Sequence, residues 1–84
     1  MKTITQNGTN LSKYLFEDDK AVTVGDDKVT VGSAESPDFY ISDLNSGNCT
    51  LHESVTNAPS DWVGNKYTFD GTTWTQDSNW VDPE

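Results

Sequence analysis

Three stretches of the chain alternate apolar and polar residues on both sides of a short turn, which is the pattern of a β-hairpin. The stretches and their turns are residues 2–16 with Asn7-Gly8, residues 21–32 with Asp26-Asp27, and residues 66–75 with Asp70-Gly71. Asn-Gly and Asp-Gly accept the positive φ angles of a type I′ turn. The pattern therefore predicts three antiparallel hairpins.

The first hairpin has two interpretations. A two-residue turn at Asn7-Gly8 sets Ile4 opposite Leu11, and the returning strand continues to Phe16. The alternative is a short helix that begins at Asn10 as its N-cap and ends at Phe16. We favour the strand, because no helical stripe of apolar residues persists beyond one turn.

The second hairpin is the most regular. Its turn sets Val22 opposite Val31 and Val24 opposite Val29 on one face. The threonines between them fall on the other face, because side chains alternate along a strand. The sequence predicts one valine face and one threonine face.

The third hairpin gathers the aromatic residues, since five of the nine lie within residues 62–80. A type I′ turn at Asp70-Gly71 sets Tyr67 opposite Trp74 and Phe69 opposite Thr72. All four side chains then share one face.

The middle of the chain predicts further short strands. Residues 38–42 form one, with Phe39 and Ile41 facing the core and Tyr40 on the other side, and residues 49–55 form another. No helix is available to connect parallel strands. We therefore expect an all-β fold, a small antiparallel meander of hairpins that forms a compact barrel or a two-layer sandwich.

The length indicates a single β domain over residues 1–84, with a weakly ordered tail at 77–84. Only 32% of the residues are hydrophobic, so the core must be thin. Small domains with thin cores often gain stability from a partner. A homo-oligomer is therefore one expectation.

The charge narrows the choice of partners. The formal net charge is −9, with five lysines and no arginine. Arginine is the usual reader of phosphates and base edges, so we expect neither nucleic-acid binding nor binding to anionic membranes. The acidic surface either keeps the protein soluble or docks on a basic partner protein.

The two residues best suited to catalysis or metal binding do not form a site. Cys49 and His52 are the only cysteine and histidine, so the chain cannot form an internal disulfide or supply the four ligands of structural zinc. On a strand, residues three apart point to opposite faces. No phosphate-binding loop or nucleophile elbow is present. We expect no enzymatic activity and no cofactor.

Four carboxylates are weak candidates for a calcium site. Asp18, Asp19, Asp26 and Asp27 lie in two neighbouring turns that would meet at one end of a barrel. Their spacing differs from that of an EF-hand loop. Apart from this possibility, the sequence predicts no metal site.

The aromatic residues are the candidate binding residues. Trp62, Tyr67, Trp74 and Trp80 either form the core or make a surface platform for a sugar or a protein, because tryptophan faces stack on sugar rings and are enriched at interfaces. Their order loosely resembles that of small chitin- and cellulose-binding β-modules.

A stronger likeness spans nearly the whole chain. Its segments are residues 7–10 (NGTN), 14–19 (YLFEDD), 50–53 (TLHE), 61–67 (DWVGNKY), 69–75 (FDGTTWT) and 79–84 (NWVDPE). Together they resemble small uncharacterised proteins of marine T4-like tailed phages, especially cyanophages. The resemblance implies a phage context, in the virion or the cytoplasm of the infected host, and it implies no catalytic residues. The N-terminus lacks the apolar stretch of a signal peptide.

Three functions follow as hypotheses. The first is a non-enzymatic accessory or structural protein that acts through self-association or by binding a phage or host protein, since flat threonine-rich strands and open sheet edges favour strand pairing. The second is a small carbohydrate-binding module that uses surface tryptophan and tyrosine. The third is an acidic inhibitor of a basic host protein.

Overall fold

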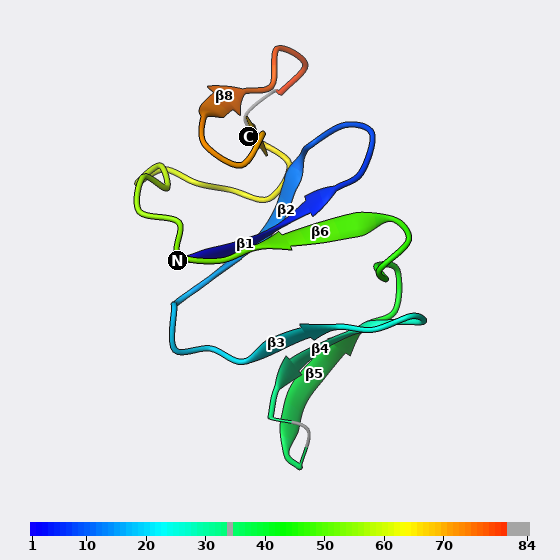
Figure 1. Ribbon diagram of the computed structural model, residues 1–84. Helices are drawn as coiled ribbons and strands as arrows, with labels where there is room; N and C mark the ends of the chain where they lie inside the picture. The colour runs from blue at the N-terminus through cyan, green and yellow to red at the C-terminus, as the bar shows by residue number, and fades with distance from the viewer. Residues whose placement is uncertain (34, 81–84) are drawn as a thin grey trace.

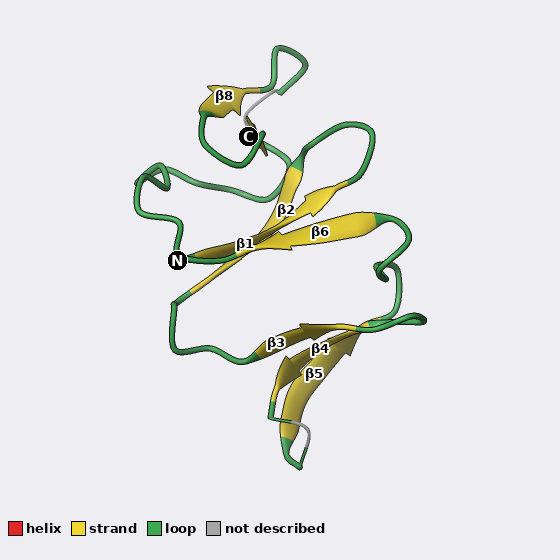
Figure 2. Ribbon diagram, viewed as in Figure 1, coloured by secondary structure: helices red, strands yellow, loops and turns green. Residues whose placement is uncertain are grey.

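The computed structural model describes residues 1–33 and 35–80, and these residues form an all-β fold with no helix (Figure 2). The strands are β1 (Lys2–Gln6), β2 (Ser12–Phe16), β3 (Val22–Val24), β4 (Val29–Gly32), β5 (Pro37–Ile41), β6 (Cys49–His52), β7 (Tyr67–Phe69) and β8 (Trp74–Gln76). All the pairings are antiparallel. The predicted fold class is confirmed: the sheets stack as in a sandwich and do not close into a barrel.

The strands form three small sheets, in the orders β2-β1-β6, β3-β4-β5 and β7-β8. Figure 1 shows β2-β1-β6 in the middle, with β3-β4-β5 on one side and the β7–β8 hairpin on the other. Strand β6 does not pair with β5, its predecessor along the chain, but returns to pair with β1. The middle sheet is therefore covered from both sides.

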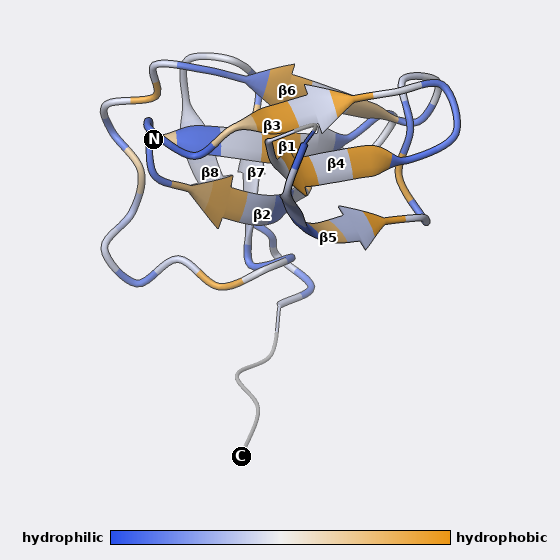
Figure 3. Cartoon of the chain, turned by 90° about the horizontal axis from the view of Figure 1, so that it is seen from below, coloured by the Kyte–Doolittle hydropathy of each residue, from blue (hydrophilic) through white to orange (hydrophobic). Residues whose placement is uncertain are grey.

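The core lies between the first two sheets. Its buried residues come from β1, β4, β5, β6 and the loop after β5, and they are Ile4, Val29, Val31, Ile41, Leu44 and Cys49. The predicted valine pairs of the second hairpin are confirmed in full. Figure 3 shows the resulting alternation of hydrophobic and polar residues along β4. Burial of these aliphatic side chains is the main force that joins the two sheets.

The first hairpin is confirmed as a pair of strands, but its predicted register is wrong. Ile4 lies opposite Tyr14 rather than Leu11, with a bulge after Ile4. Residues 7–11 connect the two strands, and within them Gly8 and Asn10 have φ angles of 92° and 60°. Asparagine tolerates this left-handed conformation, so Asn10 extends the loop instead of capping a helix. The alternative of a helix from Asn10 to Phe16 is therefore wrong.

The third hairpin also has a longer loop than predicted. Phe69 lies opposite Trp74, and Tyr67 lies opposite Gln76. The cause is the Asp70 side chain, which accepts hydrogen bonds from the N–H groups of Thr72 and Thr73 at 2.9 and 2.7 Å. These bonds hold the pKa of the Asp70 carboxyl below its ordinary value. A side-chain acceptor thus stabilises a four-residue loop in place of a type I′ turn.

Two further predictions concern Phe39 and the C-terminal tail. Phe39 lies on the core-facing side of β5, as predicted, because it pairs with the buried Val31, but it is 44% exposed and the core does not cover it. The core ends before it reaches this part of the edge strand. Of the tail predicted to be weakly ordered, residues 81–84 lie outside the described residues, while the N–H of Trp80 donates to the Asp77 carbonyl at 3.0 Å.

Candidate functional site

Trp62, one of the predicted binding residues, anchors a buried hydrogen-bond relay. Its Nε1–H donates to Ser12 Oγ at 2.9 Å, and Thr3 Oγ1 donates to the carbonyl of Tyr14 at 2.8 Å. The hydroxyl oxygens of Ser12 and Thr3 are 2.6 Å apart, and both residues are fully buried. Because each hydroxyl has one proton, Ser12 donates to Thr3. The indole N–H of Trp62 thus already has a hydrogen-bond acceptor within the protein, the Ser12 hydroxyl.

Tyr67 and Trp74 are brought together, as predicted, on one face of the β7–β8 hairpin. Their ring centroids are 6.3 Å apart, and Trp74 stacks on Phe69 at 4.5 Å. Trp74 Nε1–H donates to Asn57 Oδ1 at 3.2 Å, and Asn57 Nδ2–H donates to the carbonyl of Thr72 at 3.0 Å. Trp74 is therefore tied to its own hairpin and to the segment before it.

Tyr67 also belongs to a charged cluster at the surface. Its hydroxyl donates to Asp61 Oδ1 at 2.7 Å, and Lys66 Nζ lies 3.0 Å from Asp61 Oδ2. The hydrogen bond from Tyr67 is the main cause that holds the pKa of Asp61 below its ordinary value, and the Lys66 ammonium adds to the effect. The same hydrogen bond raises the pKa of Tyr67. The fourth predicted residue, Trp80, is half-buried in the turn after β8.

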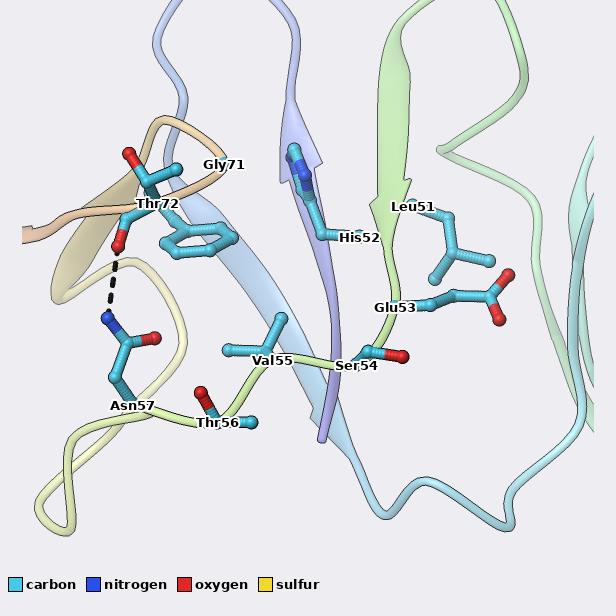
Figure 4. Close-up of a pocket in the computed structure, with 10 residues that line it drawn as sticks. Leu51, His52, Glu53, Ser54, Val55, Thr56, Asn57, Gly71 and Thr72 are labelled. Atoms are coloured by element: carbon cyan, nitrogen blue, oxygen red, sulfur yellow. Dashed lines mark hydrogen bonds between the residues drawn. The ribbon is translucent and has the colours of Figure 1, made fainter.

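A groove of about 490 Å³ opens beside this hairpin, between its loop and the segment that follows β6 (Figure 4). Asn57 and Thr72 join its two walls through their hydrogen bond. His52 Nε2 lies 3.1 Å from Thr5 Oγ1, and the imidazole packs edge-on against Phe69 at 5.1 Å. Burial lowers the pKa of His52, which favours the neutral imidazole.

Cys49 and His52 lie on opposite faces of β6, as the strand geometry requires. Cys49 belongs to the aliphatic core and its Sγ–H donates to the Asn45 carbonyl at 3.1 Å. Burial raises the pKa of the thiol. His52 instead contacts Thr5 on the other face. The two side chains do not form a catalytic pair.

The four candidate calcium ligands are not brought together. Asp18 and Asp19 precede β3, whereas Asp26 and Asp27 follow it, so the two pairs flank a single strand at its opposite ends. Asp18 instead lies 2.5 Å from the N-terminal ammonium. Within residues 1–33 and 35–80, no three histidine, cysteine or acidic side chains are grouped as metal ligands.

Strand β5 displays the aromatic residues that the sequence did not single out for binding. Phe39 is 44% exposed and Tyr40 is 55% exposed, on opposite faces of the strand. Among the described residues, the only other exposed large hydrophobic side chain is Val63. Lys28 Nζ lies 4.9 Å from the centre of the Tyr40 ring. β5 is an edge strand of its sheet, with β4 on one side.

The turn between β3 and β4 determines which backbone groups of β4 point towards β5. The N–H of Gly25 donates to the carbonyl of Lys28 at 2.8 Å, so these residues form a hydrogen-bonded pair. Hydrogen-bonded and non-bonded pairs alternate along an antiparallel ladder. Thr30 therefore directs its N–H and C=O towards β3, whereas Val29 and Val31 direct theirs towards β5.

The same alternation fixes the free edge of β5. Ile41 and Phe39 pair with the two β4 residues whose groups point towards β5, so they direct their own N–H and C=O inward. Tyr40, between them, directs its N–H and C=O out of the sheet. The structure gives these two groups no partner among the described residues. The edge thus offers a donor, an acceptor and two exposed rings.

A scan of protein-family models finds no match to the chain, and searches of curated proteins and of solved structures find none either. The described residues include no helix that is long and apolar enough to span a membrane.

Proposed function

We propose that the protein is a non-enzymatic interaction protein that binds an extended protein strand along the edge of β5. The strand comes from a second copy of the chain or from another protein. The observation that carries the proposal is the exposure of Phe39 and Tyr40 beside the outward N–H and C=O of Tyr40. In strand addition, main-chain hydrogen bonds supply affinity and side chains on both faces supply specificity.

The contacts of the other aromatic residues support a binding site at β5, because these residues already have partners within the protein. Trp62 and Trp74 donate their indole N–H groups to Ser12 and Asn57, and Trp74 is stacked on Phe69. A sugar platform needs an open ring face and free polar groups around it. The structure therefore favours protein binding at β5 over carbohydrate binding at the hairpin.

The acidic turns give less support to an inhibitor of a basic host protein. Such an inhibitor would present its carboxylates along one face, whereas the acidic pairs before and after β3 lie at opposite ends of that strand. The biological setting that we propose, an accessory or structural role in a phage particle or infected cell, rests on the resemblance to cyanophage proteins.

Amide hydrogen exchange tests the proposal directly. The probe is a synthetic peptide, Thr-Val-Lys-Val-Thr-Val-Lys, which favours an extended strand and carries charge opposite to that of the chain. We expect the Tyr40 amide to exchange rapidly in dilute protein and to become protected when the peptide is added or when the chain self-associates.

A proline variant provides the matched control. Tyr40→Pro removes the outward N–H without removing a ladder bond within the sheet, and an edge position of this kind tolerates proline. We expect peptide-induced protection of the rest of β5 to be lost in this variant. A Tyr40 amide in the unmodified chain that stays unprotected at every peptide and protein concentration would contradict the proposed function.

A further inference from the structure

We infer that the strand which occupies the edge of β5 is a second copy of this chain, paired antiparallel about a two-fold axis at Tyr40. The inference rests on the proposed function and specifies its partner. In such a dimer the two β3-β4-β5 sheets join through their β5 strands into one continuous sheet. The contact is isologous, because each copy uses the same surface.

The backbone of Tyr40 fits this symmetry. Its N–H and C=O both point outward, so two copies related by a two-fold axis exchange two hydrogen bonds, Tyr40 N–H to Tyr40 C=O in each direction. This is the hydrogen-bonded pair of an antiparallel ladder, in which Cα atoms are about 5.5 Å apart. No backbone group within either sheet has to change its partner.

The side chains also become paired. On the face that carries the core, Phe39 lies opposite Ile41 of the second copy, and the reverse pair forms at the same time. An aromatic ring opposite a β-branched residue is a favourable cross-strand pair. On the other face the two Tyr40 rings meet. The two exposed rings of β5, 44% and 55% exposed in the single chain, are thereby covered.

The charges near β5 permit the approach of a second acidic chain. The formal charge of the chain is −9, yet the Asp38 carboxylate is neutralised by an ion pair with Lys20, and Lys28 lies over the Tyr40 ring. In the proposed register, Asp38 of one copy lies opposite Ser42 of the other. Ser42 is the next residue beyond the pair formed by Val29 and Ile41. Lys28 directly precedes Val29 of β4, so in this register it lies on the far side of Ser42 from Asp38 of the other copy, two strands or about 10 Å away. The arrangement thus places opposite charges near each other across the proposed interface.

Few residues can pair between the two β5 strands, and this short ladder makes the dimer weak. Pro37, at the start of β5, has no N–H to donate, and the pairing of β5 with β4 shifts between Val31 and Gly32. A proline and a bulge are devices that limit pairing along an edge strand. We expect a weak dimer that forms as the chain concentration rises and that does not extend into a fibre through this edge.

Disulfide cross-linking tests both the partner and the register. Two Tyr40→Cys chains would place their Cα atoms about 5.5 Å apart, within the range for a disulfide. Phe39→Cys residues would be offset diagonally by about 8 Å, beyond that range. Val63→Cys, at a position that is 45% exposed, controls for random collision. The native Cys49 is buried and stays in place in all three variants.

We expect Tyr40→Cys to form a covalent dimer under mild oxidation at least roughly tenfold faster than either other variant, because only its sulfur atoms are held in range. Equal rates for the three variants, or the fastest rate for Phe39→Cys, would overturn the inference. The unmodified chain gives a second measurement: in a mixture of isotope-labelled and unlabelled protein, Phe39 ring protons should show contacts to Ile41 methyl groups across the interface. The absence of these contacts at high concentration would also overturn the inference.

The hydrogen-exchange and cross-linking results together distinguish failure of this inference from failure of the proposed function. If the Tyr40 amide is protected by the strand peptide but no variant cross-links selectively, β5 binds a strand from another protein and the second copy is excluded as its partner. If neither occurs, both proposals fail.

Discussion

The β7–β8 hairpin and strand β5 both carry clustered aromatic residues, but they use them in opposite ways. In the hairpin, Phe69 is 3% exposed, Trp74 stacks on it, and the indole N–H of Trp74 is bonded to Asn57. In β5, Phe39 and Tyr40 are exposed and have an open strand edge beside them. One cluster covers the protein's own sheet, and the other is exposed at the edge of its sheet.

The difference arises from what lies beneath each cluster. The hairpin packs on a face of the middle sheet built from hydroxyl residues, of which Thr3, Thr5 and Ser12 are buried and hydrogen-bonded. Those groups can satisfy an indole or imidazole N–H. Strand β5 extends past the aliphatic core, and its Phe39 and Tyr40 are 44% and 55% exposed. A high local density of aromatic residues therefore does not by itself identify a binding surface.

The largest expected effect in this comparison comes from truncating the centre of the hairpin cluster. Phe69→Ala should lower the free energy of unfolding by about 3–5 kcal/mol, because it leaves a cavity between His52 and Trp74. Urea denaturation measures the loss, and Phe69→Leu, which keeps most of the apolar volume, should lose much less. Equal losses in the two variants would show that the ring does not fill a specific site.

The hydroxyl relay should give the next largest effect. Ser12→Ala leaves the indole N–H of Trp62 without its acceptor in a partly buried position, at a cost of about 1–3 kcal/mol. The same denaturation experiment measures it, with Thr50→Val as control, since the Thr50 hydroxyl bonds Asn7 at an exposed position. Near-equal stabilities of the Ser12→Ala variant and the control would contradict the relay.

Acidification should lower the free energy of unfolding by less than the two substitutions above, through protonation of His52 beside the hairpin. Burial lowers the folded-state pKa of His52 below the unfolded value of about 6.5. The unfolded chain therefore binds the proton more readily, and stability falls as the pH drops from about 6.5 towards the folded pKa. We expect His52→Gln to flatten this part of the profile in denaturation curves recorded between about pH 7.5 and 5. A profile that is unchanged in the variant would contradict the prediction.

Substitution of the exposed ring on β5 should have the smallest effect on stability and a large effect on association. Tyr40→Lys replaces a side chain that is 55% exposed, so we expect the free energy of unfolding to change by no more than about 0.5 kcal/mol. A second positive charge beside Lys28 should oppose dimer formation. The matched control is Val63→Lys, which should change neither stability nor association. A Tyr40→Lys variant with a much lower free energy of unfolding would contradict the prediction and assign the Tyr40 ring to the core.

The features that could be predicted from the sequence are local ones. The second hairpin was predicted to the residue, since alternation of valine and threonine around one turn determines both its faces. The registers of the other two hairpins were wrong because Asn10 adopts a left-handed conformation and the Asp70 side chain caps its own loop. Neither effect can be seen in the hydrophobic pattern.

The features that the sequence could not predict depend on contacts between distant segments. The pairing of β6 with β1 joins residues more than forty positions apart. Thr3 and Ser12 look like members of a solvent-facing strand, but both are buried, and the indole that bonds Ser12 comes from Trp62, fifty positions along the chain. Similarly, the exposure of Phe39 follows from the place of β5 at the edge of its sheet. Residue type alone indicates the aromatic residues of the hairpin as candidates for binding, and residue type does not distinguish a buried ring from an exposed one.

Molar mass in solution, measured by light scattering over a range of chain concentrations at low and high salt, tests most directly whether β5 is an association edge. We predict that the mass rises with concentration from 9.3 kDa towards twice that value, and more readily in high salt, which screens the net charge of −9. Tyr40→Lys should remain at 9.3 kDa, while Val63→Lys should follow the unmodified chain. A mass of 9.3 kDa at every concentration, or a Tyr40→Lys variant that associates as well as the unmodified chain, would contradict self-association through β5.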